Sequence, residues 1–371
     1  FQFSPGGNDY RVDVTVVRSP VSTSTGAFAG PFTWGPVNEP TLISSEDVLV
    51  RTFGAPTDDN YESFFSAANF LAYSDSLYVV RVDDAASASA ASGTPFSAKY
   101  PGTMGESLKV IMTPYSADGD QHFETTATIA GLFVDISADR YKASFDGNTA
   151  INATGRELQA GDILVFNEND SREQEVTIAS ISGADINFVE KFSDYEDFGD
   201  ANTDVTTTVT LKSGISKVTG NAPAAGTLHV AVIDEDGKFS GVPGTVLEVY
   251  EGVSTTAGAK NADGTANYWV DAINNRSNYI AADSATALPT TTVYASMSGG
   301  ADTTTEADLS IGTYVQGYDL FKDTNQYDIS LVVTGHADAV KSTYVIDNIC
   351  ETRKDCIAFV SPELGDTSEA A

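Results

Sequence analysis

The chain is poor in basic side chains. Only 20 lysines and arginines stand against 52 aspartates and glutamates in 371 residues, so the formal net charge is −32 at pH 7. A field of this sign repels nucleic acids and anionic membranes at long range, and we expect no direct nucleic-acid binding. The ordinary interpretation is an acidic, well-solvated surface. Adaptation to a salty medium, where screening weakens the self-repulsion, is the alternative.

Cysteines and long apolar runs are also scarce. Cys350 and Cys356 are too few for the disulfide framework of a secreted protein, and we expect two buried thiols, one near a helix end and one at a strand start. No apolar run approaches the ~20 residues of a membrane span, and no signal-like segment leads the chain, so membrane insertion is not expected. Because the first residue is Phe1 rather than methionine, we expect further sequence upstream of it.

The short motifs that mark catalytic and cofactor sites are missing. There is no G-x-G-x-x-G or G-x-x-x-x-G-K-S/T phosphate loop, no G-x-S-x-G elbow, no H-E-x-x-H and no C-x-x-C. His122, His229 and His336 lie in separate segments, whereas a catalytic or zinc site needs converging ligands. His229 lies in an apolar strand, which favours a core or edge histidine. We therefore expect neither an enzyme nor a cofactor.

Runs of acidic and amide side chains could supply calcium with oxygen ligands. They lie at 118–120, 167–170 and 234–237. None completes the twelve-residue EF-hand pattern with its final glutamate. Polar turns explain these runs, and no metal is expected.

The chain begins with a predicted extended arm, Gln2–Val17. Within it Val12, Val14 and Val16 alternate with polar residues, which is the period of a strand with one buried face. An ordinary first strand of the local sheet is one interpretation. A strand donated to a neighbouring subunit is the other.

A helix–helix–strand unit follows the arm. Ser44 and Asp47 resemble a capping box before a short helix that ends near Gly54. A second helix is predicted after 58–59, and it leads to the strand Leu77–Val82. The apolar face of the second helix is predicted to hold Tyr61, Phe64, Phe65, Ala68 and Leu71 or Ala72.

Short β-like runs separated by turn residues fill Phe123–Gly220. Their even spacing favours a sandwich or barrel inserted within another domain, and Leu158–Phe166 has the pattern of a turn that leads into a barrel strand. Strands of the surrounding domain are expected at Ser107–Met112, Leu228–Ile233 and Thr245–Tyr250. Within the insertion we predict strands at Thr125–Ile129, Leu132–Ile136, Ile163–Phe166, Glu175–Ile181, Ile186–Val189 and Val205–Leu211.

The last segment predicts a βαβ unit. Strand Ile329–Val333, a helix over about Asp338–Glu351 and strand Ile357–Val360 form a parallel pair with a right-handed crossover. Ligands of such sheets bind beyond the strand ends, here at 334–337, but the phosphate loop is missing. A helix around Asp308–Lys322 precedes this unit, with Ile311, Tyr314, Val315, Tyr318 and Phe321 predicted on one face.

Four motifs occur in an order and spacing that resemble one family. The first is Ser24–Asp84, which contains a turn at Phe32–Pro36, a stop at Thr52–Gly54 and a strand at Val79–Val82. The other three are Tyr100–Gly105 before a strand, Met297–Gly300 after a strand, and Arg353–Cys356 leading into Ile357–Pro362. Together they resemble the contractile tail sheath proteins of tailed bacteriophages of the myovirus type.

The resemblance implies an α+β or α/β multidomain fold. An α/β core would carry an inserted α/β sandwich domain and a β-barrel-like insertion. The core is expected from 1–85 and 325–371, the middle domain from 94–115 and 222–324, and the β-rich insertion from 116–221. The family's conserved region normally continues further, so the resemblance also implies a fragment that lacks the C-terminal part.

The resemblance also implies a mechanical function. Subunits of this family polymerise as stacked hexameric rings around a tail tube, assemble in the host cytoplasm, and contract in the virion to drive the tube through the host envelope for genome ejection. Partners would be further copies, the tail tube protein, and the baseplate and tail terminator proteins. Two other classes stay open: an acidic β-rich surface adhesin or receptor-binding module, and a nucleotide-dependent α/β enzyme.

Overall fold

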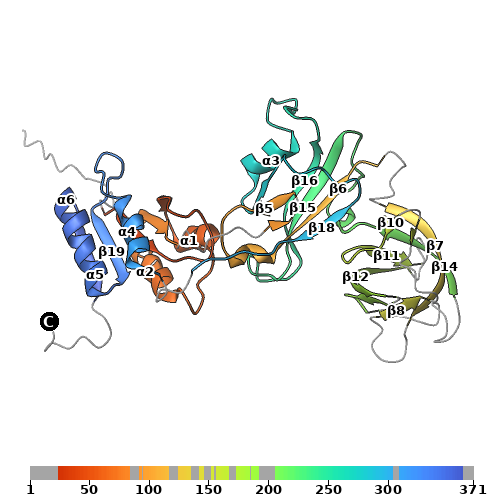
Figure 1. The fold of residues 1–371 in the computed structure, drawn as a ribbon, viewed down its shortest axis with the longest axis horizontal. Coiled ribbons are helices and arrows are strands. Elements are labelled where there is room, and N and C mark those ends of the chain that lie inside the picture. Colours follow the sequence, from red (N-terminus) through yellow and green to blue (C-terminus); the bar gives the residue numbers. More distant parts are fainter. Residues whose placement is uncertain are drawn as a thin grey trace, which may run out of the picture.

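The described residues form three groups of elements along one axis. These are a five-stranded sheet, a four-stranded sheet and a closed barrel (Figure 1). Helices and sheets are mixed, so the expected α+β class is confirmed. The predicted arm, with Val12, Val14 and Val16, lies outside the described residues. The computed structural model describes residues 24–83, 92–93, 95–116, 124–134, 142–145, 152–153, 156–166, 173–183, 185–191, 205–303 and 309–361.

The five-stranded sheet is built from both ends of the described chain. Its order is β2-β3-β1-β19-β20. β2 (Thr41–Ile43) is antiparallel to β3 (Leu77–Arg81). β3, β1 (Gly26–Gly30), β19 (Leu331–His336) and β20 (Ile357–Ser361) are parallel. The unit predicted between 329 and 360 is therefore present, with its two strands side by side.

Alternate residues of β1 face two layers of helices. Phe28 packs with residues of α1 (Glu46–Phe53) and α2 (Tyr61–Leu71) on one face. Ala27 and Ala29 pack on the other face with α4 and with a helical segment that begins after Asp338. The elements of this second layer are α4 (Ile311–Asp319), α5 (Ala339–Tyr344), the π-helical η4 (Val345–Cys350) and α6 (Glu351–Arg353).

Two predictions about α1 and α2 need correction. The side chain that caps α1 is Ser45, which accepts a hydrogen bond from Val48 N, rather than Ser44. In α2, Phe64 is buried as predicted, but Tyr61 and Phe65 are 50% and 48% exposed. The spacings 61–65–68 and 64–67–68 both fit a helix, and packing on the sheet selects the second.

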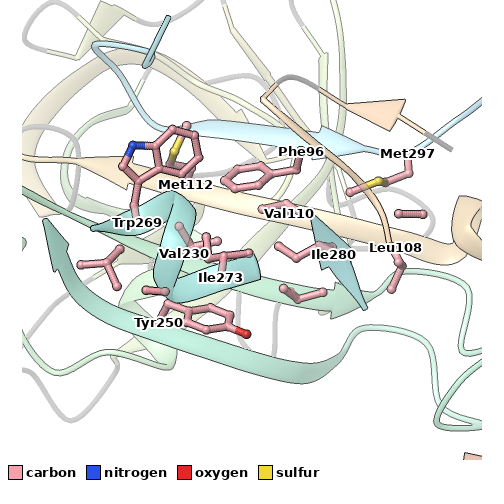
Figure 2. Packing of buried hydrophobic residues seen from close by; sticks show 14 of the residues in the cluster. Phe96, Leu108, Val110, Met112, Val230, Tyr250, Trp269, Ile273, Ile280 and Met297 are labelled. Atoms are coloured by element: carbon pink, nitrogen blue, oxygen red, sulfur yellow. The ribbon is translucent and has the colours of Figure 1, made fainter. Parts of the chain in front are cut away.

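The four-stranded sheet is antiparallel, with the order β16-β15-β6-β18. Its core lies between the sheet and a layer that contains α3 (Trp269–Arg276), where Trp269 stacks edge-on against Phe96 (Figure 2). The sheet strands are β6 (Leu108–Pro114), β15 (Thr227–Asp234), β16 (Thr245–Ser254) and β18 (Val293–Ser296). The covering layer also holds β4 (Ser92–Gly93), β5 (Phe96–Ala98) and β17 (Ile280–Ala282), and η1 (Thr103–Ser107) precedes β6.

The barrel closes in the order β11-β12-β13-β8-β7-β14. The strands predicted at 125–129 and 132–136 are one strand, and β8 was not predicted. All four residues of β11 are buried, as the apolar run Ile163–Phe166 indicated. The strands are β7 (Glu124–Val134), β8 (Lys142–Phe145), β11 (Ile163–Phe166), β12 (Gln174–Ser182), β13 (Asp185–Phe188) and β14 (Val205–Lys212), with a hairpin of β9 (Asn152–Ala153) and β10 (Arg156–Glu157) and the short η2 (Gly214–Lys217).

The chain leaves for the barrel and returns from it at adjacent strands. Pro114, the last residue of β6, pairs with Leu228 of β15. Tyr294 of β18 then joins the barrel to the sheet. Its hydroxyl donates to Asp162 Oδ1 at 2.6 Å and accepts a hydrogen bond from Gly214 N at 2.8 Å.

Helix α4 packs with the five-stranded sheet. Its Tyr314 and Tyr318 lie in the cluster that contains Ala29 and Val80, and the Tyr318 hydroxyl donates to Val333 O at 2.8 Å. The predicted boundary had placed this helix in the middle domain, within 222–324. The packing moves it to the core, whereas the domain division as a whole stays a prediction.

Asp234, in the acidic run 234–237, organises the turn between β15 and β16. Its Oδ1 accepts a hydrogen bond from Ser107 Oγ at 2.7 Å, and its Oδ2 accepts from the backbone N–H groups of Phe239 and Ser240 at 3.0 and 2.7 Å. Burial raises the pKa of Asp234, but these hydrogen bonds outweigh it, so the pKa lies below its usual value. A polar turn, as expected, accounts for this run.

We predict that Asp234→Asn lowers the free energy of unfolding by about 2 kcal/mol at pH 7, because the amide cannot accept all of these hydrogen bonds. A carboxyl with a depressed folded-state pKa stabilises the fold above its unfolded pKa, and this contribution is lost as the pH falls through the folded value. Denaturant unfolding should therefore show the difference between the two proteins beginning to shrink below about pH 4 and continuing to shrink as the pH falls through the lower folded-state pKa. Asp236→Asn, on the exposed neighbour, is the control. An equal effect of both substitutions would contradict the assignment.

Candidate functional site: a buried arginine junction

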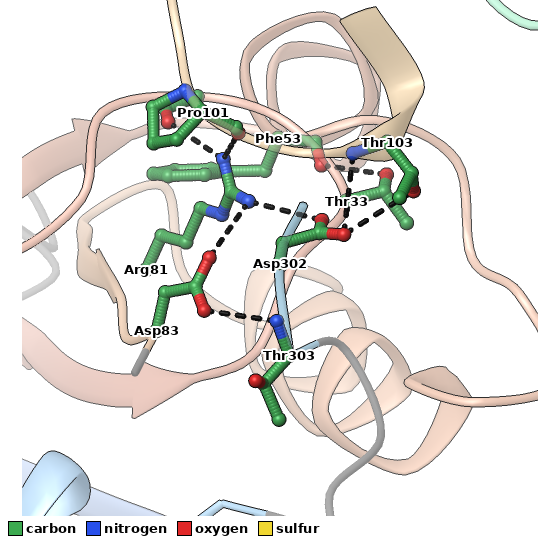
Figure 3. Close-up of polar contacts among 9 residues, drawn as sticks. Thr33, Phe53, Arg81, Asp83, Pro101, Thr103, Asp302 and Thr303 are labelled. Carbon is green, nitrogen blue, oxygen red and sulfur yellow. Dashed lines mark hydrogen bonds and ion pairs between the residues drawn. The ribbon is translucent and has the colours of Figure 1, made fainter. Parts of the chain in front are cut away.

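The five-stranded and four-stranded sheets meet where the chain crosses between them. Arg81, the last residue of β3, lies at this junction (Figure 3). Its backbone is fixed by pairing with Gly30 of β1 and by a bridge to Val37. Its side chain points at two segments of the other sheet's unit, around 101–103 and 302–303.

The Arg81 side chain is fully buried. Nη1 donates to the carbonyl oxygens of Gly35 at 3.1 Å and Pro101 at 2.8 Å. Nη2 donates to Asp83 Oδ2 at 3.3 Å and Asp302 Oδ2 at 3.2 Å. One guanidinium thus binds three remote segments of the chain as well as Asp83 of its own segment, and only its Nε lacks a hydrogen-bond partner among the described residues.

The two carboxylates extend the network to both crossings, the segments around 83–103 and 300–309 in which the chain passes between the two sheets. Asp302 Oδ1 accepts hydrogen bonds from the backbone N–H and the hydroxyl of Thr103, both at 3.2 Å. Asp83 Oδ1 accepts from Thr303 N at 2.9 Å. The outgoing chain after β3 and the returning chain before α4 are therefore held to the same arginine (Figure 3).

Close packing at the junction requires glycine at Gly102. Its φ is +131°, and a Cβ atom there would lie 2.8 Å from Asp302 Oδ2 and 3.1 Å from Arg81 Nη2. Gly300 is packed against the Gly102 backbone, and its N–H donates to Glu106 Oε1 at 3.2 Å. A side chain at either glycine would push the two crossings apart.

The junction is a small ionic cluster that is almost completely buried. The side chains of Asp83 and Asp302 are 1% and 3% exposed. Burial lowers the pKa of Arg81, and the two carboxylates oppose this change. Because each charge depends on the others, the cluster can hold segments together but presents no reactive group to a substrate.

An aromatic contact crosses the same junction. Trp34, from the loop after β1, belongs to the core of the four-stranded sheet. Its ring meets Tyr100 and Phe239 edge-on, with centroids 5.3 and 5.0 Å apart. The loop is held by hydrogen bonds to Phe53 O from Trp34 N and Thr33 Oγ1. A side chain from one unit thus fills the core of the next.

Beside this contact the surfaces of the two units separate. Two adjoining hollows of about 380 Å³ each share Ala55, Met104 and Lys238 as lining residues. Arg81 and Trp34 thus connect the two units beside these hollows.

Of the three histidines, His229 and His336 lie in separate parts of the described fold, and His122 lies outside the described residues. His229 is buried, with Nε2 2.8 Å from Asn221 O, and its Nδ1 accepts a hydrogen bond from Gly252 N at 2.9 Å, as fits a core histidine. His336 lies at the surface with Nδ1 2.5 Å from Glu62 Oε2. In the part of the chain that the structure describes, no three His, Cys, Asp or Glu side chains are grouped as metal ligands. None of its helices combines the length and apolar content that crossing a membrane takes.

The sequence motifs supply most of the junction. The first contributes Trp34, Gly35 and Arg81, the second Pro101 with its neighbours, and the third Gly300. The order and spacing of the motifs do not predict that they converge on one arginine. The lone arginine in the apolar strand Val79–Val82 was the available signal, because a charged residue in such a strand needs buried partners.

Comparison with known proteins gives matches to tail sheath proteins. Residues 23–82 match the family model "Tail sheath protein Gp18 domain III N-terminal region". The tail sheath protein of Salmonella phage ViI is 28% identical over 98% of this chain and 60% of that protein, and the tail sheath protein of Vibrio phage KVP40 is 24% identical over 97% of this chain and 62% of that protein. A sheath tail protein structure from Listeria innocua aligns with 90% of this chain and 45% of that one, at 11% identity and a TM-score of 0.42.

The resemblance to the contractile tail sheath proteins of tailed phages is confirmed by these matches. The chain spans about 60% of the length of the two phage relatives. The matched family segment begins three residues before β1 and ends at the residue after Arg81, so it includes the arginine at the junction.

We predict that Arg81→Met lowers the free energy of unfolding by about 3–5 kcal/mol, because two buried carboxylates lose their counter-ion. Arg51→Met is the matched control, since Arg51 forms an exposed ion pair with Asp47 and should change stability by less than about 1 kcal/mol. Asp302→Asn should fall between the two. Denaturant unfolding measures all three, and an Arg81→Met value as small as the control would contradict a supporting role for the cluster.

Proposed function

We propose that this chain is part of a structural subunit of a contractile phage tail sheath. The observation that carries the proposal is its similarity, along almost the whole chain, to proteins named tail sheath protein. The subunits would polymerise as stacked hexameric rings around a tail tube. Contraction would drive the tube through the host envelope and permit genome ejection.

The proposed cycle needs no bound nucleotide. Assembly in the host cytoplasm would give an extended lattice, and energy stored in subunit contacts would be released when the lattice shortens in the virion. The partners would be other copies of the subunit, the tail tube protein, and the baseplate and tail terminator proteins. The role is mechanical, so we infer no enzymatic activity and no cofactor. The −32 charge disfavours direct contact with nucleic acid.

The domain division belongs to this proposal. We infer a core from 1–85 and the C-terminal segment, a middle domain around the four-stranded sheet, and a β-rich insertion at about 116–221. Two features support this division. β1, β3, β19 and β20 share one sheet, and the barrel is inserted in the sequence between β6 and β15, which are paired strands of another sheet. The return to the core would come near Leu309, because α4 packs there.

In this scheme the junction transmits force. A core held in the lattice could move the outer domains only through the segments that join them. Arg81 bonds both crossings, and Trp34 fills the core of the next unit, so the two parts would move as one body.

Electron microscopy tests the proposal. The full-length protein that contains this chain should form long hollow tubes, because a sheath subunit polymerises with copies of itself. A protein that stays dispersed but binds the surface of host cells would instead support the adhesin alternative. Arg51→Met should leave the tubes unchanged.

We also propose that the arm at 2–17 donates a strand to a neighbouring subunit, with Val12, Val14 and Val16 on its buried face. In the full-length protein, Val14→Pro should suppress tube formation, since proline removes a backbone donor from the ladder. Val14→Ile keeps the donor, the strand preference and the apolar side chain, and should preserve the tubes. Light scattering follows assembly, and tubes undiminished by Val14→Pro would refute the connector role.

A further inference from the structure

The only two cysteines of the chain lie in contact with each other. Cys350 ends the π-helical η4, and Cys356 directly precedes β20. Their sulfur atoms are 3.6 Å apart, with the Cys356 thiol oriented toward Cys350 Sγ. Both residues are partly exposed rather than buried, which corrects the expectation from the sequence.

The turn between the cysteines is held in place by its own residues. Lys354 has a left-handed backbone, with φ +61°, and its N–H donates to Cys350 O at 2.7 Å. Arg353 is buried, and it donates to the carbonyl oxygens of Phe321 at 2.6 Å and Tyr327 at 2.8 Å. Its Nε also donates to Asp355 Oδ1 at 2.9 Å. The fold therefore brings the two thiols together through a fixed turn rather than through a flexible loop.

We propose that Cys350 and Cys356 are an intramolecular disulfide site. The sulfur atoms would close from 3.6 Å to a bond of ~2.05 Å. A small-molecule disulfide such as oxidised glutathione is the oxidant. One thiolate attacks it and releases one reduced glutathione, and the second thiolate then displaces the other. Two protons leave the cysteines, two electrons pass to glutathione, and one sulfur–sulfur bond forms for the one broken.

The bond would anchor an edge strand that is weakly packed. Ile357 and Phe359 of β20 are 65% and 56% exposed, and within the described sheet the strand is paired on one side, by β19. A disulfide between Cys350 and Cys356 ties the start of β20 to the end of the helical segment. If β20 separated from β19, the residue that directly precedes it would then remain bonded to the end of η4.

The environment of the two thiols favours slow thiol–disulfide exchange. Burial, and to a lesser degree the interaction with Cys356, raise the pKa of Cys350 to about 12, so little thiolate is present at neutral pH. The pair would stay reduced during brief exposure to a weak oxidant and would close on prolonged exposure.

Peptide mapping identifies the bond. The 371-residue chain is incubated with oxidised glutathione, remaining thiols are blocked in denaturant, and the protein is digested with trypsin without reduction. Cleavage after Lys341, Arg353 and Lys354 places Cys350 and Cys356 on separate peptides. We expect these two peptides to appear joined, with the loss of two hydrogen atoms, and to separate on reduction. Two blocked thiols, or a disulfide that links two chains, would overturn the proposal.

A redox titration shows whether the fold supports the bond. In glutathione buffers, the equilibrium constant for closing the ring should be larger in the folded chain than in urea, by about tenfold or more. Equal or smaller values in the folded chain would mean that the fold opposes closure. Cys350→Ser and Cys356→Ser are the controls and should yield only mixed disulfides with glutathione. Hydrogen exchange of Ile357–Ser361 should slow on oxidation, and unchanged exchange would refute the anchoring of β20.

Discussion

A fully buried guanidinium must find its hydrogen bonds inside the protein, and Arg81 finds them on Asp83 and on three remote segments of the chain. Opposite charge is needed close by because one charge alone could not be buried, and Asp83 and Asp302 supply it. Gly102 follows from the same requirement, since a side chain there would occupy the space of the ion pairs. The arrangement of the two sheets is thus tied to the burial of one charge, and Trp34 adds an apolar contact to this link.

Local pattern was a sufficient guide wherever a residue's neighbours in sequence decided its structure. Ile163–Phe166 is apolar at every position and forms a strand buried at every position. Gly54 ends α1 because its φ of +86° suits glycine. The pattern was not sufficient where two solutions fitted equally well. The exposed Phe65 shows this, because the helical period allowed two faces of α2 and only the position of the sheet chose between them.

The site shows the same limit more strongly. Arg81 and Asp302 are separated by 221 positions in the sequence, and the bond between them depends on the path of the whole intervening chain. No periodicity connects such residues, so the sequence allowed the motifs to be recognised but did not predict their contacts in the folded chain. Ser45 illustrates the limit at short range, because Ser44 and Ser45 are chemically identical and only backbone geometry decides which one caps α1.

The adjacency of the barrel's two attachment points bears on how the molecule could be engineered. The chain departs after Pro114 and is back in register at Leu228, with Tyr115 N donating to Thr227 O at 3.2 Å. A folded module whose own termini lie close together can replace an insertion of this geometry without altering the strands that flank it. The connection between β6 and β15 is therefore a suitable position for inserting a foreign domain, such as an enzyme or a fluorescent reporter.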